Sequence, residues 1–395
     1  MSVALTVLQI VSHGVGDSSR RGVGGPEKRT LESLRRLDRS RFRPVIAYSR
    51  EGALFDSFVS SGAPVVDLSI RGIEDVGAGR RLSAIIRDEA VDVVHSQGPL
   101  AYDFYGARAA VREGVPFVVT RPVVIADYTC SALKRAALSA VDRSTLRTAA
   151  RVVAVSENGR GRLAALRGVD PGKVLLVRNG VDVERYRPDP GARARLLAET
   201  GDGSTDPEAP VVGMLAQLVD HKGWDDFLLV ARELLAERPD ALAFVVGGGP
   251  MLDELQAASR EMGVAGSVRF LGLRSDVEKI LPALDVVLLT SRREGLPVSL
   301  IEAMASGRPI VTTDAGGSAE LVREGETGHV VPTGDWRAAS ACVRGIVNDR
   351  ERMARMGAAA RALAVAEFSL ERMVAAYEDV YRVVVSSSPL AGGAR

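Results

Sequence analysis

The chain has 395 residues, of which 46% are apolar and 26% charged, a profile that excludes both a disordered chain and a single ordinary core. Its two cysteines, Cys130 and Cys342, exclude a disulfide framework or a cysteine zinc site and fit a reducing cytosol. The net charge of +1 hides an asymmetry, because residues 1–185 carry 28 basic and 20 acidic side chains, whereas the remainder carries 23 and 30.

The first residues, "MSVALTVLQIV", predict a β-strand, because they lack the basic n-region and the small-residue cleavage site of a signal peptide. Further β-branched runs occur at "RPVIAYS", "PVVDLS", "VDVVHS", "PFVVT", "RVVAVS" and "KVLLVRN", each followed by a longer helical pattern. This alternation predicts a doubly wound parallel sheet. No apolar run approaches the roughly 18 residues of a membrane span.

Residues 187–210 contain prolines, glycines and acidic residues that interrupt the alternation, and they predict a linker. A second series of strands follows at "PVVGMLAQ", "ALAFVVGGG", "SVRFLG", "LDVVLLTS", "RPIVTTD" and "GHVVPT". We therefore expect two Rossmann-like α/β domains, over residues 1–187 and 210–368, that face each other across a cleft. A C-terminal helix over residues 369–385 is expected to pack back on the first domain.

Two glutamates mark the candidate site, because ligands of open parallel sheets bind beyond the carboxyl ends of the strands. The segment "SRREGLPVSLIEAMASG" follows a predicted strand and holds Glu294 and Glu302, eight positions apart. Proline is favoured at a first helical position, so we expect a helix from Pro297 to about Ser306, closed by Gly307. Glu294 then lies in the loop, while Glu302 lies in the second turn and leans back toward the helix start.

This helix start predicts a ligand that combines phosphate with hydroxyl groups. Free backbone N–H groups around Leu296, Val298 and Ser299 would bind a phosphate. The neighbouring carboxylates would instead accept hydrogen bonds from hydroxyls. A nucleotide-sugar satisfies both, because its diphosphate lies between a ribose and a hexose. The spacing alone fits equally well with two exposed acids that the helix dipole favours.

The longer segment "SRREGLPVSLIEAMASGRPIVTTDAGGSAELV" closely resembles the E-x7-E signature of the retaining glycosyltransferases of family 4, which have the two-domain GT-B fold. The segments "GVGGPEKRTLESL", "VDVVHSQG", "VVAVSENGRGRL", "VRNGVDVERYRP", "HKGWDDFLLVARELL", "VVGGGPMLDEL", "FLGLRSDV" and "GETGHVVPTGD" match the family in the same order. The resemblance covers most of the chain. It implies transfer of a sugar from a UDP- or GDP-linked donor, without a cofactor or an essential metal.

The resemblance also implies roles for individual residues. Glu302 would hold the ribose hydroxyls, and Glu294 the transferred sugar. Lys222, in "VDHKG", would neutralise the diphosphate as a point charge. Further donor contacts fall on the following residues of the second domain: Gly272, Leu273, Gly295, Leu296 and Pro297.

One position departs from the family pattern. Five residues before Lys222, where the family usually has an arginine that clamps the diphosphate, this chain has Gln217. Glutamine donates a hydrogen bond but brings no charge. We expect Gln217 still to contact the donor, with Arg292 or Arg293 as candidates to supply the missing charge.

The first domain contributes further candidates. Gly24 and Gly25 precede the predicted helix "PEKRTLESLRRL", and their backbone N–H groups are expected to face the diphosphate. His95 ends the strand "VDVVHS", and the resemblance places it near the acceptor, so we group it with the catalytic residues. Many family members have a further histidine in a T-x-H pattern, but here the segment is "VVTRPVV". Arg121 is the candidate to serve the acceptor instead.

Two other ligand classes are set aside. "VVGGGP" lacks a full G-x-G-x-x-G, which excludes an NAD site. The acidic pairs at Asp225 and Asp226 and at Asp182 and Glu184 are expected on solvated surfaces rather than around a metal.

We therefore predict a nucleotide-sugar-dependent glycosyltransferase whose acceptor is a glycan, a lipid-linked molecule or a small molecule, and we expect no nucleic-acid partner. Two alternatives remain open: a nucleotide-sugar epimerase of the same fold, and a nucleotide-sugar binding module without catalysis.

The basic first half favours an anionic substrate or membrane surface, although solvated helix faces explain it equally. Its cations cluster in two segments: Lys28, Arg29, Arg35, Arg36, Arg39, Arg41 and Arg43, then Lys134, Arg135, Arg143, Arg147 and Arg151. In the second segment apolar residues recur at roughly helical spacing, at Leu133, Ala137, Leu138, Val141 and Leu146. The hypothesis is a cytosolic enzyme that contacts the inner membrane leaflet through its first domain. The alternative is a soluble acceptor and a helix that packs on the sheet.

Overall fold

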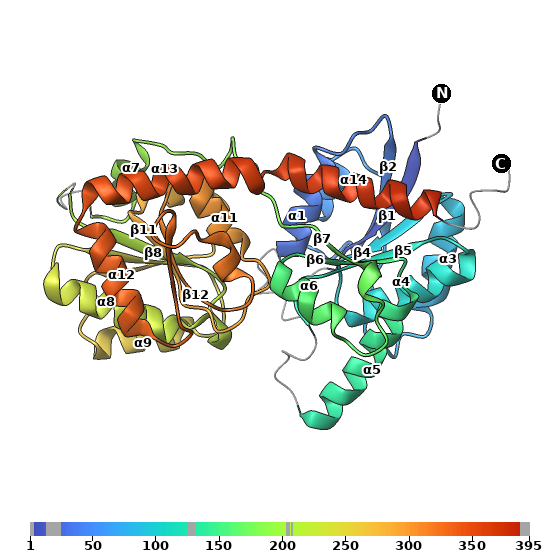
Figure 1. The fold of residues 1–395 in the computed structure, drawn as a ribbon, viewed down its shortest axis with the longest axis horizontal. Helices are drawn as coiled ribbons and strands as arrows, with labels where there is room; N and C mark the ends of the chain where they lie inside the picture. The colour runs from blue at the N-terminus through green and yellow to red at the C-terminus, as the bar shows by residue number, and fades with distance from the viewer. Residues whose placement is uncertain (1–3, 13–24, 125–130, 203–205, 207, 388–395) are drawn as a thin grey trace. The chain divides into compact units, whose positions relative to one another are not determined.

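The computed structural model describes residues 4–12, 25–124, 131–202, 206 and 208–387 (Figure 1). Contacts divide the chain into two compact units, unit 1 with residues 1–178 and 370–395 and unit 2 with residues 179–369. Each unit contains one fully parallel sheet and its covering helices. This architecture confirms the predicted fold class of two Rossmann-like α/β domains.

The sheet of unit 1 has seven strands in the order β3-β2-β1-β4-β5-β6-β7. They are β1 (Leu5–Ile10), β2 (Phe42–Tyr48), β3 (Val65–Asp67), β4 (Val93–Ser96), β5 (Phe117–Arg121), β6 (Arg151–Ala154) and β7 (Val174–Leu176). The chain adds strands outward in one direction from β1 and in the other from β4, so the topological switch point lies between these two strands.

Among the described residues, eight helical segments belong to unit 1. They are α1 (Gly25–Leu34), α2 (Phe55–Val59), α3 (Ala78–Asp88), α4 (Leu100–Glu113), α5 (Ala132–Thr148), α6 (Glu157–Ala164), η3 (Pro171–Lys173) and α14 (Leu370–Ser386). Ser131 and Ser156 cap α5 and α6, because each side-chain oxygen accepts a backbone N–H of the first turn. The last helix, α14, thus belongs to unit 1 together with the N-terminal part of the chain.

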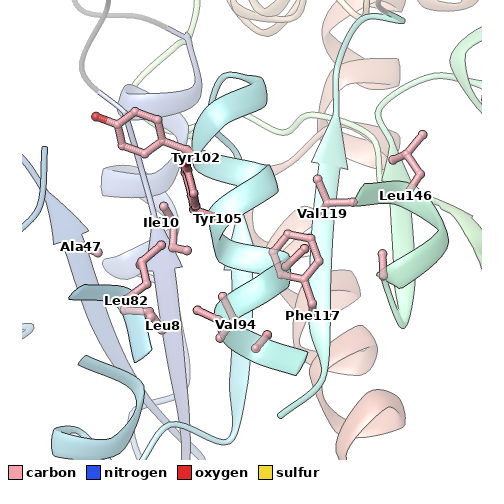
Figure 2. Packing of buried hydrophobic residues seen from close by; sticks show 14 of the residues in the cluster. Leu8, Ile10, Ala47, Leu82, Val94, Tyr102, Tyr105, Phe117, Val119 and Leu146 are labelled. Carbon is pink, nitrogen blue, oxygen red and sulfur yellow. The ribbon is translucent and has the colours of Figure 1, made fainter. Parts of the chain in front are cut away.

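Alternating strand residues fill the two faces of this sheet. Leu8 and Ile10 face one layer with Leu82 of α3 and Tyr105 of α4, as Figure 2 shows. Val7, the residue before Leu8, faces the opposite layer. There α14 covers the sheet with Leu370, Met373, Val374, Tyr377, Val380, Tyr381 and Val384. Because both faces are covered, apolar residues occur on both faces of the strands rather than on one face only.

The sheet of unit 2 has six strands in the order β10-β9-β8-β11-β12-β13. They are β8 (Val211–Leu215), β9 (Leu242–Val246), β10 (Val268–Gly272), β11 (Val286–Leu289), β12 (Ile310–Thr313) and β13 (Gly328–Val331). The helical segments are α7 (Ala192–Glu199), η4 (Asp220–Lys222), α8 (Trp224–Glu237), α9 (Leu252–Glu261), α10 (Val277–Ile280), η5 (Leu281–Ala283), α11 (Val298–Ala305), η6 (Ser318–Leu321), α12 (Trp336–Val347) and α13 (Arg350–Glu367). The switch point lies between β8 and β11.

The predicted linker over residues 187–210 is wrong in part, because it contains the helix α7. Leu196 and Leu197 are buried, and the Arg193 guanidinium lies 3.0 Å from the carboxylate of Asp285. Residues 179–187, expected in the first domain, also belong to unit 2. There the Arg361 side chain donates to the Tyr186 carbonyl at 3.0 Å. Apolar burial and buried arginine contacts outweigh the turn-forming residues that flank the helix.

Candidate functional site

The switch point of the second sheet brings two predicted site residues into contact. Lys222 lies in η4 after β8, and Glu294 lies in the loop after β11. The Lys222 Nζ donates to Glu294 Oε1 at 2.6 Å, and the two side chains are only 18% and 9% exposed. The pair therefore lies at the carboxyl edge of the sheet, where ligands of this architecture bind.

Backbone contacts hold the two loops together. Gly223 adopts φ +69°, and a Cβ at this position would lie 2.1 Å from the Thr290 carbonyl oxygen. The Thr290 hydroxyl donates to the Gly223 carbonyl at 2.7 Å. A second contact joins the same two loops, because the Arg292 N–H donates to the His221 carbonyl at 2.8 Å. Only glycine fits at position 223, and this close approach aligns Lys222 with the loop that carries Glu294.

Glu294 is fixed from two further sides. The Ser291 hydroxyl donates to the same oxygen, Glu294 Oε1, at 2.7 Å. From the loop after β12, Gly316 adopts φ +58°, and a Cβ there would lie 2.1 Å from the Glu294 carbonyl oxygen. The adjacent Gly317 N–H donates to the Gly295 carbonyl at 3.0 Å. The carboxylate is thus preorganised by its neighbours rather than free to rotate.

The second glutamate lies in α11, as the sequence predicted. The helix begins at Val298, one residue later than expected, because Pro297 has an extended ψ of 114° and acts as the N-cap. Glu302 falls in the second turn and is 6% exposed. Gly307 follows the helix end with φ +74°, the conformation that its glycine predicts.

The loop before α11 is anchored by a residue far away in sequence. The Asn179 side-chain amide donates to the Leu296 carbonyl at 2.8 Å, and both residues belong to unit 2. The sequence analysis assigned no role to Asn179, Ser291 or Gly316. Each lies in or beside a family-like segment, "VRNGVD", "TSRREG" or "DAGGSAEL", but their partners are not neighbours in sequence.

The other predicted donor residues of unit 2 lie at the same edge. Gln217 follows β8 with an exposed side chain, and its carbonyl accepts the Trp224 indole N–H at 2.8 Å. Gly272 ends β10 with φ +65°, and its carbonyl accepts the Gly247 N–H at 2.9 Å. Leu273 is 66% exposed, so its side chain is accessible to a ligand.

Two arginines were candidates to replace the missing arginine, and the structure separates them. The Arg292 guanidinium is held by the carboxylate of Asp225 at 2.6 Å and by the Asp220 carbonyl at 2.7 Å. The charge of Arg293 reaches His221, the residue before Lys222. Burial lowers the pKa of His221, and the charges of Lys222 and Arg293 lower it further. Arg293 therefore shares its electrostatic environment with Lys222.

His95 is not available for the catalytic role expected of it. The imidazole is fully buried, and its Nδ1 and Nε2 lie 2.7 Å from the Tyr381 hydroxyl and 2.8 Å from the Thr120 hydroxyl. Burial, together with the charge of Arg29, lowers the pKa of His95 to about 3, so the ring stays neutral. Because both ring nitrogens have partners inside the unit, we revise His95 to a structural residue.

Arg121 is likewise engaged inside unit 1 rather than presented to an acceptor. Its guanidinium is 6% exposed and forms ion pairs with Asp103 of α4 and Asp142 of α5. The Arg121 Nε donates to Asp142 at 3.0 Å, and the Ser96 hydroxyl donates to Asp103 at 2.5 Å. The cluster connects two helices to the sheet. Its two carboxylates compensate the charge of Arg121, which we had expected to interact with the acceptor.

The glycine loop of unit 1 is only partly within the described residues. Gly25 begins α1 and is exposed, with open space where a Cβ would lie. Gly24 lies outside the described residues. The expected backbone contact with a diphosphate therefore stays a prediction.

The two basic segments differ in the structure. In the first, Arg29 is buried and donates to Gln97 at 2.7 Å. Three of its six other cations pair with acids of unit 1: Arg36 with Glu371, Arg41 with Glu378 and Arg43 with Glu89. These pairs reduce the net positive charge that this segment presents.

The second basic segment forms α5, whose two halves pack differently. Residues 131–137 are exposed on every side, and Leu133 is 84% exposed, whereas Thr145 and Leu146 are buried. A surface cavity of about 720 Å³ beside the second half is lined by Ala140, Arg143, Ser144, Arg147, Thr148 and Arg167. Among the described helices, none is long and apolar enough to cross a bilayer.

Comparisons with known proteins agree with this architecture. The family model described as glycosyl transferases group 1 matches residues 200–363, and that of the glycosyl transferase 4-like domain matches residues 24–180. The solved structure of HepE from Anabaena in complex with UDP has a TM-score of 0.79 at 20% identity, covering 95% of this chain and 99% of that chain. The fold is therefore that of a two-domain GT-B protein.

Two curated relatives place the chain more closely. A D-inositol 3-phosphate glycosyltransferase from Rhodococcus jostii is 30% identical over 388 residues, covering 88% of this chain and 81% of the relative. A GDP-mannose-dependent alpha-(1-6)-phosphatidylinositol monomannoside mannosyltransferase from Mycolicibacterium smegmatis is 38% identical over 193 residues. That match covers 46% of this chain and about half, 49%, of the relative. The chain belongs to family 4 of the glycosyltransferases, as its motifs predicted.

Proposed function

We propose that this protein transfers a sugar from a nucleotide-diphosphate-sugar to a hydroxyl group of an acceptor, with retention at the anomeric carbon. The observation that carries the proposal is the arrangement at the β8–β11 switch point. There a lysine, a preorganised glutamate and a buried glutamate in a helix start lie at one edge of the sheet. This set suits a ligand with a diphosphate between two hydroxyl-bearing rings.

In the proposed complex, Glu302 accepts hydrogen bonds from the ribose, and Glu294 accepts them from the transferred sugar. Lys222 balances the diphosphate charge, and the backbone at Gly295, Leu296 and Pro297 meets the sugar or the diphosphate. Arg293 supplies the charge that Gln217 lacks. These residues act by orientation and charge stabilisation rather than by covalent catalysis.

The proposed step exchanges one bond for another at the anomeric carbon. The acceptor oxygen approaches on the face from which the diphosphate departs and forms the new glycosidic bond. The bond between the anomeric carbon and the diphosphate oxygen breaks, and the leaving diphosphate takes the acceptor's proton. Lys222 stabilises the negative charge that develops on this leaving group.

The names of the relatives suggest which class of acceptor to test. One names phosphatidylinositol monomannoside and the other inositol 3-phosphate, so we propose an acceptor that carries a polyol hydroxyl near a phosphate. GDP-mannose, named for the first relative, is the first donor to try. The two alternatives, an epimerase and a binding module, have no observation among the described residues in their favour.

We further propose that the protein is cytosolic and contacts an anionic membrane surface through α5. The proposal is supported by the exposed first half of this helix, which presents Leu133 beside Lys134 and Arg135. Each cation near such a surface contributes about 1 kcal/mol, whereas a single leucine anchors weakly. The contact would be peripheral and sensitive to salt.

Thermal unfolding in the presence of nucleoside diphosphates and nucleotide-sugars tests the donor part first. A ligand at 100 times its dissociation constant adds about 2.7 kcal/mol to the stability. Incubation with donor alone and then with donor plus acceptors tests the reaction. We expect turnover only with an acceptor present. An altered free sugar formed from the donor alone would contradict the proposal.

A further inference from the structure

The Lys222–Glu294 pair has a consequence for which ligands the site accepts. Both residues are expected to contact the donor, yet in the structure they contact each other at 2.6 Å. The ammonium that would meet the diphosphate is already compensated, and so is the carboxylate that would meet the sugar. A ligand must therefore draw the pair apart or share it.

The surroundings hold this pair in place. Ser291 donates to the same carboxylate oxygen at 2.7 Å, and the Gly223–Thr290 approach fixes the loop that carries Lys222. The side chains are 18% and 9% exposed, so water compensates them poorly if they separate. Charge-assisted hydrogen bonds of this kind are about twice as strong as neutral ones.

We propose that Glu294 is a selectivity residue that discriminates against the free nucleoside diphosphate in favour of the intact nucleotide-sugar. This inference rests on the proposed function and deepens it. A nucleoside diphosphate attracts Lys222 but supplies no donor to replace it at Glu294, whose carboxylate then keeps only the hydrogen bond from the Ser291 hydroxyl. The intact nucleotide-sugar attracts Lys222 and also supplies sugar hydroxyls that donate to Glu294.

Replacing Glu294 should therefore tighten binding of the free nucleoside diphosphate, whereas replacing a residue that only contacts the ligand would weaken it. Replacing Glu294 with glutamine removes the charged competitor for Lys222. The Glu294→Gln variant should bind the free nucleoside diphosphate about tenfold more tightly than the wild type, equivalent to ~1.4 kcal/mol. Its affinity for the intact nucleotide-sugar should not rise, so the ratio between the two affinities collapses.

Calorimetry with GDP, UDP and their sugar conjugates on the full chain tests this proposal. Lys222→Met should weaken both ligands, and adding Glu294→Gln in that background should give no gain, because the competition no longer exists. Glu261→Gln is the matched control. This exposed acid ends α9 and lies toward the opposite edge of the same sheet, so its replacement should leave both affinities unchanged.

The outcomes separate the two proposals. A wild type that binds one of the diphosphates, with Glu294→Gln binding it equally or more weakly, overturns the selectivity role and leaves the donor site intact. A gain that persists in the Lys222→Met background also overturns it, because the effect would then be general electrostatics. A wild type that binds none of these ligands overturns the proposed function instead.

Discussion

The Asn179 side-chain amide donates to the Leu296 carbonyl oxygen at 2.8 Å, across 117 positions of sequence. Asn179 is 4% exposed and Leu296 is likewise buried, so this hydrogen bond forms in the interior of unit 2. It anchors the loop between Glu294 and α11 from a segment outside the sheet. The geometry of the candidate donor loop therefore depends on a residue that contacts no ligand in the proposed complex.

Asn179→Asp should weaken binding of the donor, without a large change in turnover when the donor is saturating. The carboxylate cannot donate to the Leu296 carbonyl and faces it with like polarity, at a cost of about 1–3 kcal/mol. Steady-state kinetics with varied donor should show the change in KM, and Asn158→Asp, in α6 of unit 1, is the control. An unchanged donor KM would show that the loop holds its geometry without this bond.

Glu302→Ala and Glu294→Ala should separate binding from turnover. Loss of the Glu302 carboxylate should weaken the free nucleoside diphosphate, since hydrogen bonds to charged groups contribute about 1.5–3 kcal/mol each. Loss of Glu294 should not weaken binding of the free nucleoside diphosphate and should lower kcat, because its proposed partner is the transferred sugar. Calorimetry and kinetics on both variants decide this. Near-wild-type binding and activity in both would remove the assignment.

Gln217→Arg should be tolerated and should tighten donor binding by ~1–3 kcal/mol, the scale of a charge-assisted hydrogen bond. The Gln217 side chain is exposed, and its loop is held by the backbone carbonyl, so a longer side chain fits. Calorimetry compares the variant with Gln256→Arg, on α9. A large loss of donor affinity would show that the site has been rebuilt around glutamine.

Arg121→Met should destabilise unit 1 by about 3–5 kcal/mol at neutral pH, because it leaves two buried carboxylates without their cation. Burial already raises the pKa of Asp103, against the opposing charge of Arg121, and removing that charge raises it further. The folded variant then binds more protons than the unfolded chain above the unfolded carboxyl pKa of about 3.9, so its stability falls as the pH rises.

Urea denaturation of Arg121→Met and the wild type at pH 5 and pH 8 measures this difference. The loss relative to the wild type should be smaller at pH 5. Arg87→Met removes a 56% exposed partner of Glu113 and should cost less than about 1 kcal/mol at either pH. A loss that is independent of pH would mean that the carboxylates are compensated by other groups.

Flotation with vesicles that contain anionic phosphatidylglycerol tests the role of α5. The wild type should float with these vesicles at low salt and less at about 0.5 M salt, where charges are screened within a few ångströms. Lys134→Glu combined with Arg135→Glu should abolish flotation, and Arg260→Glu combined with Arg355→Glu should not. If binding does not depend on salt concentration, or if the protein does not bind anionic vesicles, the membrane contact is contradicted and a soluble acceptor becomes the better hypothesis.

Local patterns predicted more of this structure than long-range contacts did. Eleven of the thirteen named strands lie within the quoted β-branched runs, while β2 begins and β5 ends one residue outside them. The position of Glu302 follows from Pro297 and the helix pattern. The burial of His95 could not be predicted, because its partner Tyr381 lies 286 positions away on α14. Arg121 resembled a free cation for the same reason, since Asp103 and Asp142 reach it only in the folded unit.

The most direct test of the central claim is nuclear magnetic resonance of the reaction with the donor that gives the largest thermal shift and a matching acceptor. The account predicts one nucleoside diphosphate released for each glycoside formed, and a glycoside with the anomeric configuration of the donor. A product of inverted configuration would contradict the retaining mechanism. A changed free sugar that forms without any acceptor would contradict the assignment as a transferase.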